Sequence, residues 1–229
     1  MLFTDPSSYV LAAGALGTAS FALVDTSKVW DGGISNRGFD QIEEAIKKLF
    51  PADGQETPPV PFSQMKGVLR ANWLNGTALA DQKLIAKTLV KLRLNAQNAP
   101  HLAAATGVDS TLLVSVATKI ANGGDLTTAE QNVFGRFDLI LTTQLDEAYQ
   151  RADQIYRNSA KAASMFVSVL LALLGGWAVA AVSFQAYFGS TDCAIALLTG
   201  LIATPLAPIS KDIASGLTAA TKAIGLVKK

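Results

Sequence analysis

The residue types that most often carry out chemistry in proteins are scarce in this chain of 229 residues. It has one histidine, His101, and one cysteine, Cys193. A single cysteine excludes an internal disulfide and a cysteine-rich metal site, and one histidine leaves no cluster for metal binding or acid–base catalysis. We therefore expect no catalytic residues, no metal site and no cofactor, and the sequence does not predict an enzyme.

Two glycine-containing segments resemble known ligand-binding loops in part, and we compared their residue spacing with the patterns of those loops. Gly32, Gly33 and Gly38 suggest a phosphate loop, but Phe39-Asp40 follows Gly38 where that loop requires Lys and then Ser or Thr. The segment "NGGDLTTAEQ" lacks the Asp and Asn ladder and the terminal bidentate Glu of a calcium loop. We interpret the first segment as a turn ahead of a helix and the second as a capped helix start.

A stripe of basic residues is the strongest candidate for a binding surface. Lys83, Lys87 and Lys91 recur every four residues, with Arg93 beside them, and a helix places this spacing on one face. The first interpretation is a solvated face opposite the apolar residues Leu84, Ile85, Leu89 and Leu92. The alternative is contact with anionic lipid headgroups, worth about 1 kcal/mol for each basic residue near the surface.

Membrane-spanning helices are expected from the composition and from one long uncharged segment. Only 16% of the residues are charged and the mean hydropathy is +0.31, whereas soluble domains carry about 25% charged residues. Residues 162–191 contain no charged side chain, and the part from Ala162 to about Phe184 has the length of one membrane crossing. This part is predicted to span.

Two further segments are candidates for crossing. The run Ser7–Val24 has no Lys or Arg before it, so we expect a retained helix and not a cleaved signal peptide. The run Thr191–Ile209 contains Pro205 and Pro208, so a full crossing and a re-entrant or interfacial segment both remain open.

The positions of the basic residues predict an orientation. All nineteen Lys and Arg lie either from Lys28 to Lys161 or from Lys211 to Lys229. Basic residues favour the cytoplasmic side, which places the amino terminus and the 184–192 turn outside and the middle region and the tail inside. Three crossings satisfy this distribution, whereas two leave the tail on the wrong side.

The middle region is predicted to be entirely helical. Helical patterns cover residues 39–50, 62–74, 78–94, a short stretch near 101, and 110–121, and no period-two alternation is present. Residues 51–61 hold four of the eight prolines and are interpreted as a linker. From Arg136 to Leu174 there is no Gly or Pro, which predicts one continuous helix whose apolar stripe packs on the shorter helices or on a second copy.

The predicted fold class is therefore an all-α membrane protein with about three transmembrane helices and a helical cytoplasmic domain between the first and second. The predicted divisions are residues 1–26, 27–160, 161–209 and 210–229. They correspond to the first span, the cytoplasmic domain with its linker, the second and third spans, and the cytoplasmic tail.

The last hundred residues resemble, in outline, a group of small uncharacterised bacterial inner-membrane proteins. The matching residues are Phe137-Asp138, Tyr156-Arg157, Ala207-Pro208 and Asp212. The interval from Phe-Asp to Tyr is about two turns longer here, and Ile209 and Ser210 stand where that group has aromatic residues. The resemblance implies a bacterial inner (cytoplasmic) membrane and brings no activity with it.

Small residues in the first span predict close helix packing. Ala13 and Gly17, and likewise Gly14 and Thr18, have the small-xxx-small spacing that lets membrane helices approach. This face packs either against another molecule or within the monomer against Gly175-Gly176.

Three functional hypotheses follow. The first is a structural or accessory membrane protein that packs with partners or with copies of itself. The alternatives are an oligomeric pore or effector lined by the first span, and an enzyme without a recognisable motif. Nineteen basic and eighteen acidic residues nearly cancel, so nucleic acid is not an expected partner.

Overall fold

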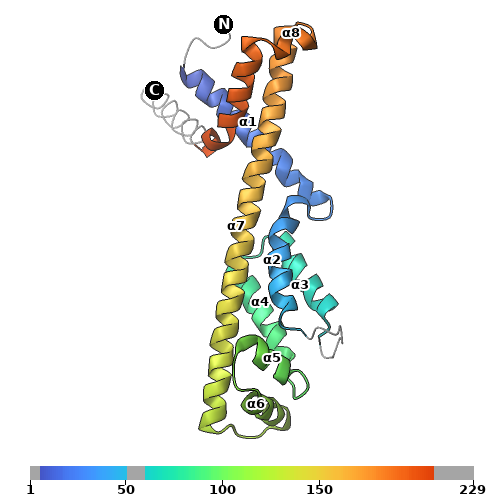
Figure 1. Cartoon of the computed structure of the whole chain (residues 1–229), viewed down its shortest axis with the longest axis vertical. Helices are drawn as coiled ribbons and strands as arrows, with labels where there is room; N and C mark the ends of the chain where they lie inside the picture. The colour runs from blue at the N-terminus through green and yellow to red at the C-terminus, as the bar shows by residue number, and fades with distance from the viewer. Residues whose placement is uncertain (1–5, 51–59, 209–229) are drawn as a thin grey trace, which may run out of the picture. The chain divides into compact units, whose positions relative to one another are not determined.

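The computed structural model describes residues 6–50 and 60–208 (Figure 1). Most of the predicted linker 51–61 and the whole predicted tail 210–229, which includes Asp212, lie outside the described residues. Within the described ranges every regular element is a helix, which confirms the all-α prediction. The chain divides into two units, Ser35–Tyr156, here called the middle unit, and Met1–Ile34 with Arg157–Lys229, here called the apolar unit.

The middle unit contains the short helices that the sequence predicts. They are α2 (Asn36–Lys47), α3 (Phe62–Leu74), α4 (Leu79–Leu92), α5 (Ala99–Thr106) and α6 (Ser110–Asn122), followed by the first part of α7 (Thr128–Ala180). Gly107 and Gly123 end α5 and α6 in the left-handed conformation, with φ of 66° and 71°, which glycine adopts without the steric cost of a Cβ.

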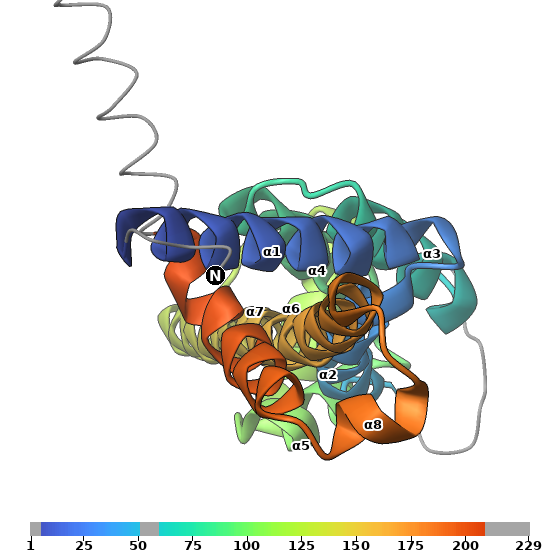
Figure 2. The same cartoon turned by 90° about the horizontal axis from the view of Figure 1, so that it is seen from above.

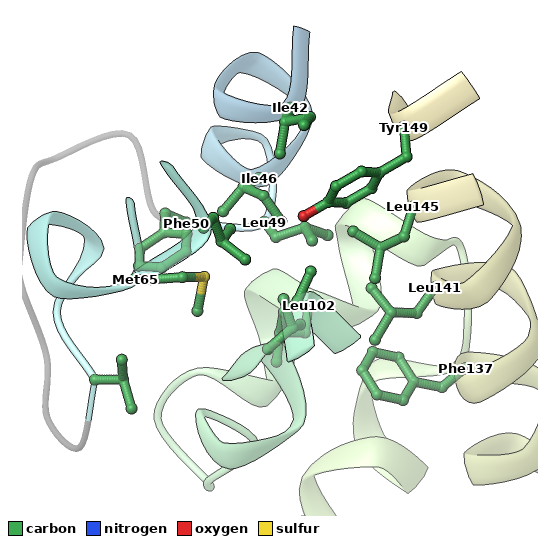
Figure 3. Close-up of a cluster of buried hydrophobic side chains, with 14 of the residues drawn as sticks. Ile42, Ile46, Leu49, Phe50, Met65, Leu102, Phe137, Leu141, Leu145 and Tyr149 are labelled. Carbon is green, nitrogen blue, oxygen red and sulfur yellow. The ribbon is translucent and has the colours of Figure 1, made fainter. Parts of the chain in front are cut away.

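The core of the middle unit lies between α7 and the shorter helices. Phe137, Leu141, Leu145 and Tyr149 follow one another at intervals of four residues along α7, and each is at most 2% exposed. Figure 3 shows these side chains directed toward residues of α2, α5 and the segment after α2, namely Ile42, Ile46, Leu49 and Leu102. The predicted apolar stripe of α7 thus packs on the shorter helices of the same chain.

A capping box starts α7, as the interpretation of "NGGDLTTAEQ" predicts. The backbone N–H of Thr127 donates to Glu130 Oε2 at 2.7 Å, and the backbone N–H of Glu130 donates to Thr127 Oγ1 at 3.4 Å. Lys119 and Ser115 also donate to the Glu130 carboxylate, at 2.7 and 2.6 Å. These hydrogen bonds, the one from Lys119 first, lower the pKa of Glu130 to about 2.

The segment ahead of α2 is a turn, and α2 itself forms two ion pairs. Gly33 has φ of +45° and lies in a turn ahead of α2, as predicted in place of a phosphate loop. In α2, Glu44 pairs with Lys48 one turn later, at 3.1 Å. Glu43 has a partner on α3, because Lys66 Nζ lies 2.7 Å from its Oε1.

The described part of the apolar unit contains α1 (Pro6–Thr26), the turn Ser27–Val29, the end of α7, α8 (Phe184–Phe188) and a helix without a label in Figure 1, Thr191–Pro208. Among the described residues, three helices are long and apolar enough to cross a membrane: Tyr9–Val29, Thr128–Ala180 and Thr191–Pro208.

The helix α7 is continuous over 53 residues, which confirms the prediction for Arg136–Leu174. The predicted end of its apolar part, at about Phe184, is four residues too late. Ala181 adopts φ of +53° after the last helical residue, Ala180, and the Ser183 hydroxyl then caps α8 by accepting a hydrogen bond from the N–H of Ala186 at 3.4 Å.

Candidate functional site

The apolar unit has an inverted distribution of side chains. Its buried residues are mostly small or hydroxyl-bearing: Ala13, Ser20, Ser164, Ser168, Ala196, Ala203, Thr204 and Ala207 are all at most 8% exposed. Its exposed residues include large apolar side chains, among them Phe166, Leu174, Val179, Ile195 and Leu198, each more than 50% exposed. In water this arrangement is costly, whereas in lipid large apolar side chains face the solvent and small residues let helices approach.

The small-residue face of α1 packs within the unit. A Cβ added to Gly17 would collide with the backbone carbonyl of Ala203 and lie 3.1 Å from the Ala207 Cβ, so the backbones of the two helices are in direct contact. Tyr9 and Thr199 form a hydrogen bond between the same two helices. Because both contacts advance along both helices, the contacts follow the same order in α1 and in Thr191–Pro208, and Figure 2 shows the two helices crossing at an angle.

The end of α7 also packs on the helix Thr191–Pro208. Ser168 Oγ donates to the carbonyl of Gly200 at 2.7 Å, and a Cβ on Gly200 would lie 2.5 Å from the Val169 Cα. Further along, a Cβ on Gly176 would lie 3.0 Å from the Ala196 Cβ. The contacts advance along one helix while they recede along the other, so α7 and Thr191–Pro208 are antiparallel.

The residues predicted to pack closely do not all lie in helix contacts. Of the two possible positions for the small face of α1, the structure shows packing inside the chain, but onto Ala203 and Ala207 and not onto Gly175-Gly176. A Cβ on Gly175 would meet nothing within 4 Å. Gly14 is buried and Thr18 is exposed, and the Thr18 hydroxyl donates to the Gly14 carbonyl at 3.0 Å.

The lysine stripe of α4 is directed toward α7 in the middle unit. Lys87 Nζ lies 2.6 Å and Lys91 Nζ 2.9 Å from the two carboxylate oxygens of Asp138, and Lys83 forms an ion pair with Asp146. Burial alone would raise the pKa of Asp138, but hydrogen bonds and the positive charges of the two lysines lower it below its usual value. Contact of these lysines with lipid headgroups stays a prediction.

Arg93, the fourth basic residue of the predicted stripe, is a core residue. It is 2% exposed, and its guanidinium carbon lies 3.5 Å from the centroid of the Phe50 ring. A cation over an aromatic face is attracted by the ring quadrupole. Its position in the sequence beside the lysines gave no signal of this role.

The interpretation of α4 as a helix with a solvated lysine face opposite the apolar residues Leu84, Ile85, Leu89 and Leu92 holds only in part. Ile85 and Leu89 pack against the core, but the lysines pair with carboxylates of α7. Leu84 and Leu92 are 63% and 56% exposed, and the buried residues of α4 are Gln82, Ala86 and Val90. Small Ala86 lets α4 approach its neighbours, and the α7 carboxylates attract the lysines, so the helix is rotated relative to the prediction.

The described part of the chain holds no group of three or more His, Cys, Asp or Glu side chains able to bind a metal ion. His101 Nε2 lies 3.2 Å from the carbonyl oxygen of Lys48 and joins α5 to the end of α2. Comparisons with protein families, with characterised proteins and with solved structures find no match to this chain. The described residues thus form two packed helical units, one with large apolar side chains on its surface and one with ion pairs near its surface.

Proposed function

We propose that the chain is an integral membrane protein with a structural or accessory role, which packs with partners or copies of itself in a larger assembly of a bacterial inner membrane. The observation that carries the proposal is the inverted burial of the apolar unit. Hydroxyl and small side chains fill its interior, and side chains such as Phe166 and Leu198 face outward.

The directions of the three apolar helices support the proposed topology. In the apolar unit α1 and Thr191–Pro208 run in one direction and α7 runs in the other. Three crossings with the amino terminus outside require this pattern, with the middle unit in the cytoplasm and the turn near Asp192 outside. An impermeant thiol reagent should then label Cys193 in intact cells. Labelling only from the cytoplasmic side contradicts the three-crossing topology.

A second face of α1 supports an assembly role. Ala12, Ala15, Ala19 and Ala22 are exposed and follow each other at intervals of three or four residues, in contrast to the large outward residues of α7. In lipid, association depends on close backbone approach, which alanine permits and leucine obstructs. This outward alanine face is therefore the proposed contact of the spans with a neighbouring molecule.

The experiment is native mass measurement of the protein in mild detergent, together with identification of co-purifying proteins. The wild type should be larger than a monomer. Ala15→Leu with Ala19→Leu should reduce the mass without loss of helix content, whereas Ala178→Leu, an exposed position on α7, should have no effect. A strictly monomeric wild type without partners contradicts the proposal.

The alternative of an oligomeric pore has less support. A pore lined by the small face of α1 needs Ala13, Gly17 and Ser20 to contact water, but Ala13 is 1% and Ser20 is 0% exposed and Gly17 is in contact with Ala203. Stepwise conductance of the purified protein in planar bilayers would favour the pore over the accessory role.

A further inference from the structure

The outward face of α4 is an apolar stripe on the middle unit. Leu84 is 63% and Leu92 is 56% exposed, and Thr88 lies between them, also exposed. The intervals of four residues place the three side chains on one side of the helix. A row of leucines on the surface is the pattern of a helix that packs against another helix.

The hydroxyl of Thr88, the polar group in this stripe, has a hydrogen-bond partner within its own helix. The Thr88 hydroxyl donates a hydrogen bond to the carbonyl of Leu84 at 2.8 Å. Covering the stripe would therefore remove two leucines from water without leaving the hydroxyl unpaired, and an unpaired buried hydroxyl is what normally opposes such burial.

The charges of α4 do not oppose the approach of an identical surface. The lysines at 83, 87 and 91 are only 23–36% exposed at their side chains, and their ammonium groups are paired with Asp138 and Asp146. Two copies of an unpaired lysine stripe would repel each other. The carboxylates of Asp138 and Asp146 offset two of the three positive charges and hold the ammonium groups on the side of α4 that faces α7.

We propose that this face of α4 is a contact surface between two copies of the chain. The stripe is symmetric about Thr88: whether two α4 helices pair parallel or antiparallel, Thr88 lies opposite Thr88 and every leucine lies opposite a leucine. A symmetric dimer requires such a self-complementary patch.

This inference rests on the proposed function, because confinement to one membrane raises the effective concentration of the two α4 faces. It adds a second interface to that proposal. This interface lies on the middle unit, and its binding partner is another copy of the same chain.

Disulfide cross-linking of the full-length protein in liposomes tests the inference. In a Cys193→Ala background, Thr88→Cys should form a covalent dimer on mild oxidation. Thr118→Cys on α6 is the matched control, since Thr118 is also exposed and its hydroxyl also donates to the carbonyl four residues earlier, at 2.9 Å. We expect cross-linking at least tenfold faster at position 88 than at position 118.

Adding Leu84→Glu and Leu92→Glu to the Thr88→Cys protein should abolish the cross-link and leave the helix content unchanged, because both side chains are mostly exposed. Equal rates at positions 88 and 118, persistence of the cross-link in the glutamate variant, or a cross-link to a different polypeptide would overturn the inference. If position 88 fails while the native mass still exceeds that of a monomer, the α4 contact is wrong and the proposed membrane assembly stands. A monomeric mass contradicts both.

Discussion

The two units of this protein have opposite interiors. In the middle unit, Phe137, Leu141 and Tyr149 are fully buried, and charged pairs such as Lys87–Asp138 lie nearer the surface. In the apolar unit, Ser164 and Ser168 are fully buried and Phe166, between them in sequence, is 66% exposed. All of these residues except Lys87 belong to α7, so one helix buries large apolar side chains in its first half and small hydroxyl-bearing side chains in its second.

The comparison separates two sources of stability. The middle unit gains from removing apolar surface from water, which is proportional to the area buried. In the membrane that we propose for it, the apolar unit would have no such gain and would depend on dispersion contacts and on a few hydrogen bonds between closely packed backbones. Substitutions that change apolar area should therefore act strongly in the first unit, and substitutions that change backbone approach should act strongly in the second.

The largest expected effect is truncation of the core of the middle unit. Phe137→Ala should lower the free energy of unfolding by about 3–5 kcal/mol, because a buried aromatic ring is lost and a cavity remains. Urea unfolding in mild detergent measures it through the fluorescence of Trp73, with Trp30 and Trp177 replaced by Phe. The control is Leu139→Ala, since Leu139 is 68% exposed on the same helix and should change stability by less than about 0.5 kcal/mol.

A backbone contact in the apolar unit should give the second largest effect. Gly17→Leu should destabilise the apolar unit by about 1–3 kcal/mol, because the added side chain has to separate α1 from Ala203. Gly175→Leu adds the same side chain where a Cβ meets nothing within 4 Å. Thermal unfolding followed through Trp177 should distinguish the two variants. Equal melting temperatures would show that the close approach of α1 does not contribute.

The capping box at the start of α7 should give a smaller, pH-dependent effect. Thr127→Ala should cost about 1 kcal/mol. Glu130 has a folded-state pKa of about 2, below its ordinary value of 4.5, so its contribution is complete above about pH 4.5 and is lost as the pH falls toward 2.

The Trp73 unfolding curves of Glu130→Gln and the wild type should therefore differ at neutral pH and converge as the pH falls to about 2. A difference that is independent of pH would contradict the assigned ionisation of Glu130.

The smallest effect concerns hydrogen bonds in the apolar unit. Ser168→Ala removes the hydrogen bond to the Gly200 carbonyl and should cost about 0.6 kcal/mol, the typical value between membrane helices. Ser164→Ala, one turn earlier, removes a buried hydroxyl that has no hydrogen-bond partner within the described part of the chain, so it should be neutral or stabilising. Thermal unfolding through Trp177 compares the two. A larger loss in Ser164→Ala would indicate a hydrogen bond formed outside the described residues.

Local patterns predicted the elements of the fold well and their pairings poorly. The helices at 62–74 and 110–121 lie within one residue of α3 and α6, because periodicity, glycine breaks and caps act over a few residues. Glu43 illustrates the opposite case. Lys47 is its neighbour on the same helix, but Lys66 is brought to it by the packing of α3, and no local spacing reveals that contact.

For the two candidate surfaces, the lysine stripe of α4 and the small-residue face of α1, the sequence likewise predicted the residues of each face but not its contacts. The sequence showed that the lysines at 83, 87 and 91 share one face and that Ala13 and Gly17 share another, since helical geometry alone decides this. It did not show what each face meets. The alternatives for α1, a second molecule or the same chain, differ only in contacts between residues almost two hundred positions apart.

The sequence by itself therefore determined that the regular elements of residues 6–50 and 60–208 are all helices, with three apolar helices among them and a continuous α7. It could do so because composition, helix breakers and periodicity are properties of neighbouring residues. Only the tertiary structure decided that the lysines of α4 turn toward Asp138 and Asp146, that Leu84 and Leu92 turn outward, and that Gly17 packs on Ala203. The rotation of a helix about its axis depends on the sum of all its contacts. That sum exists only when the other helices are in place.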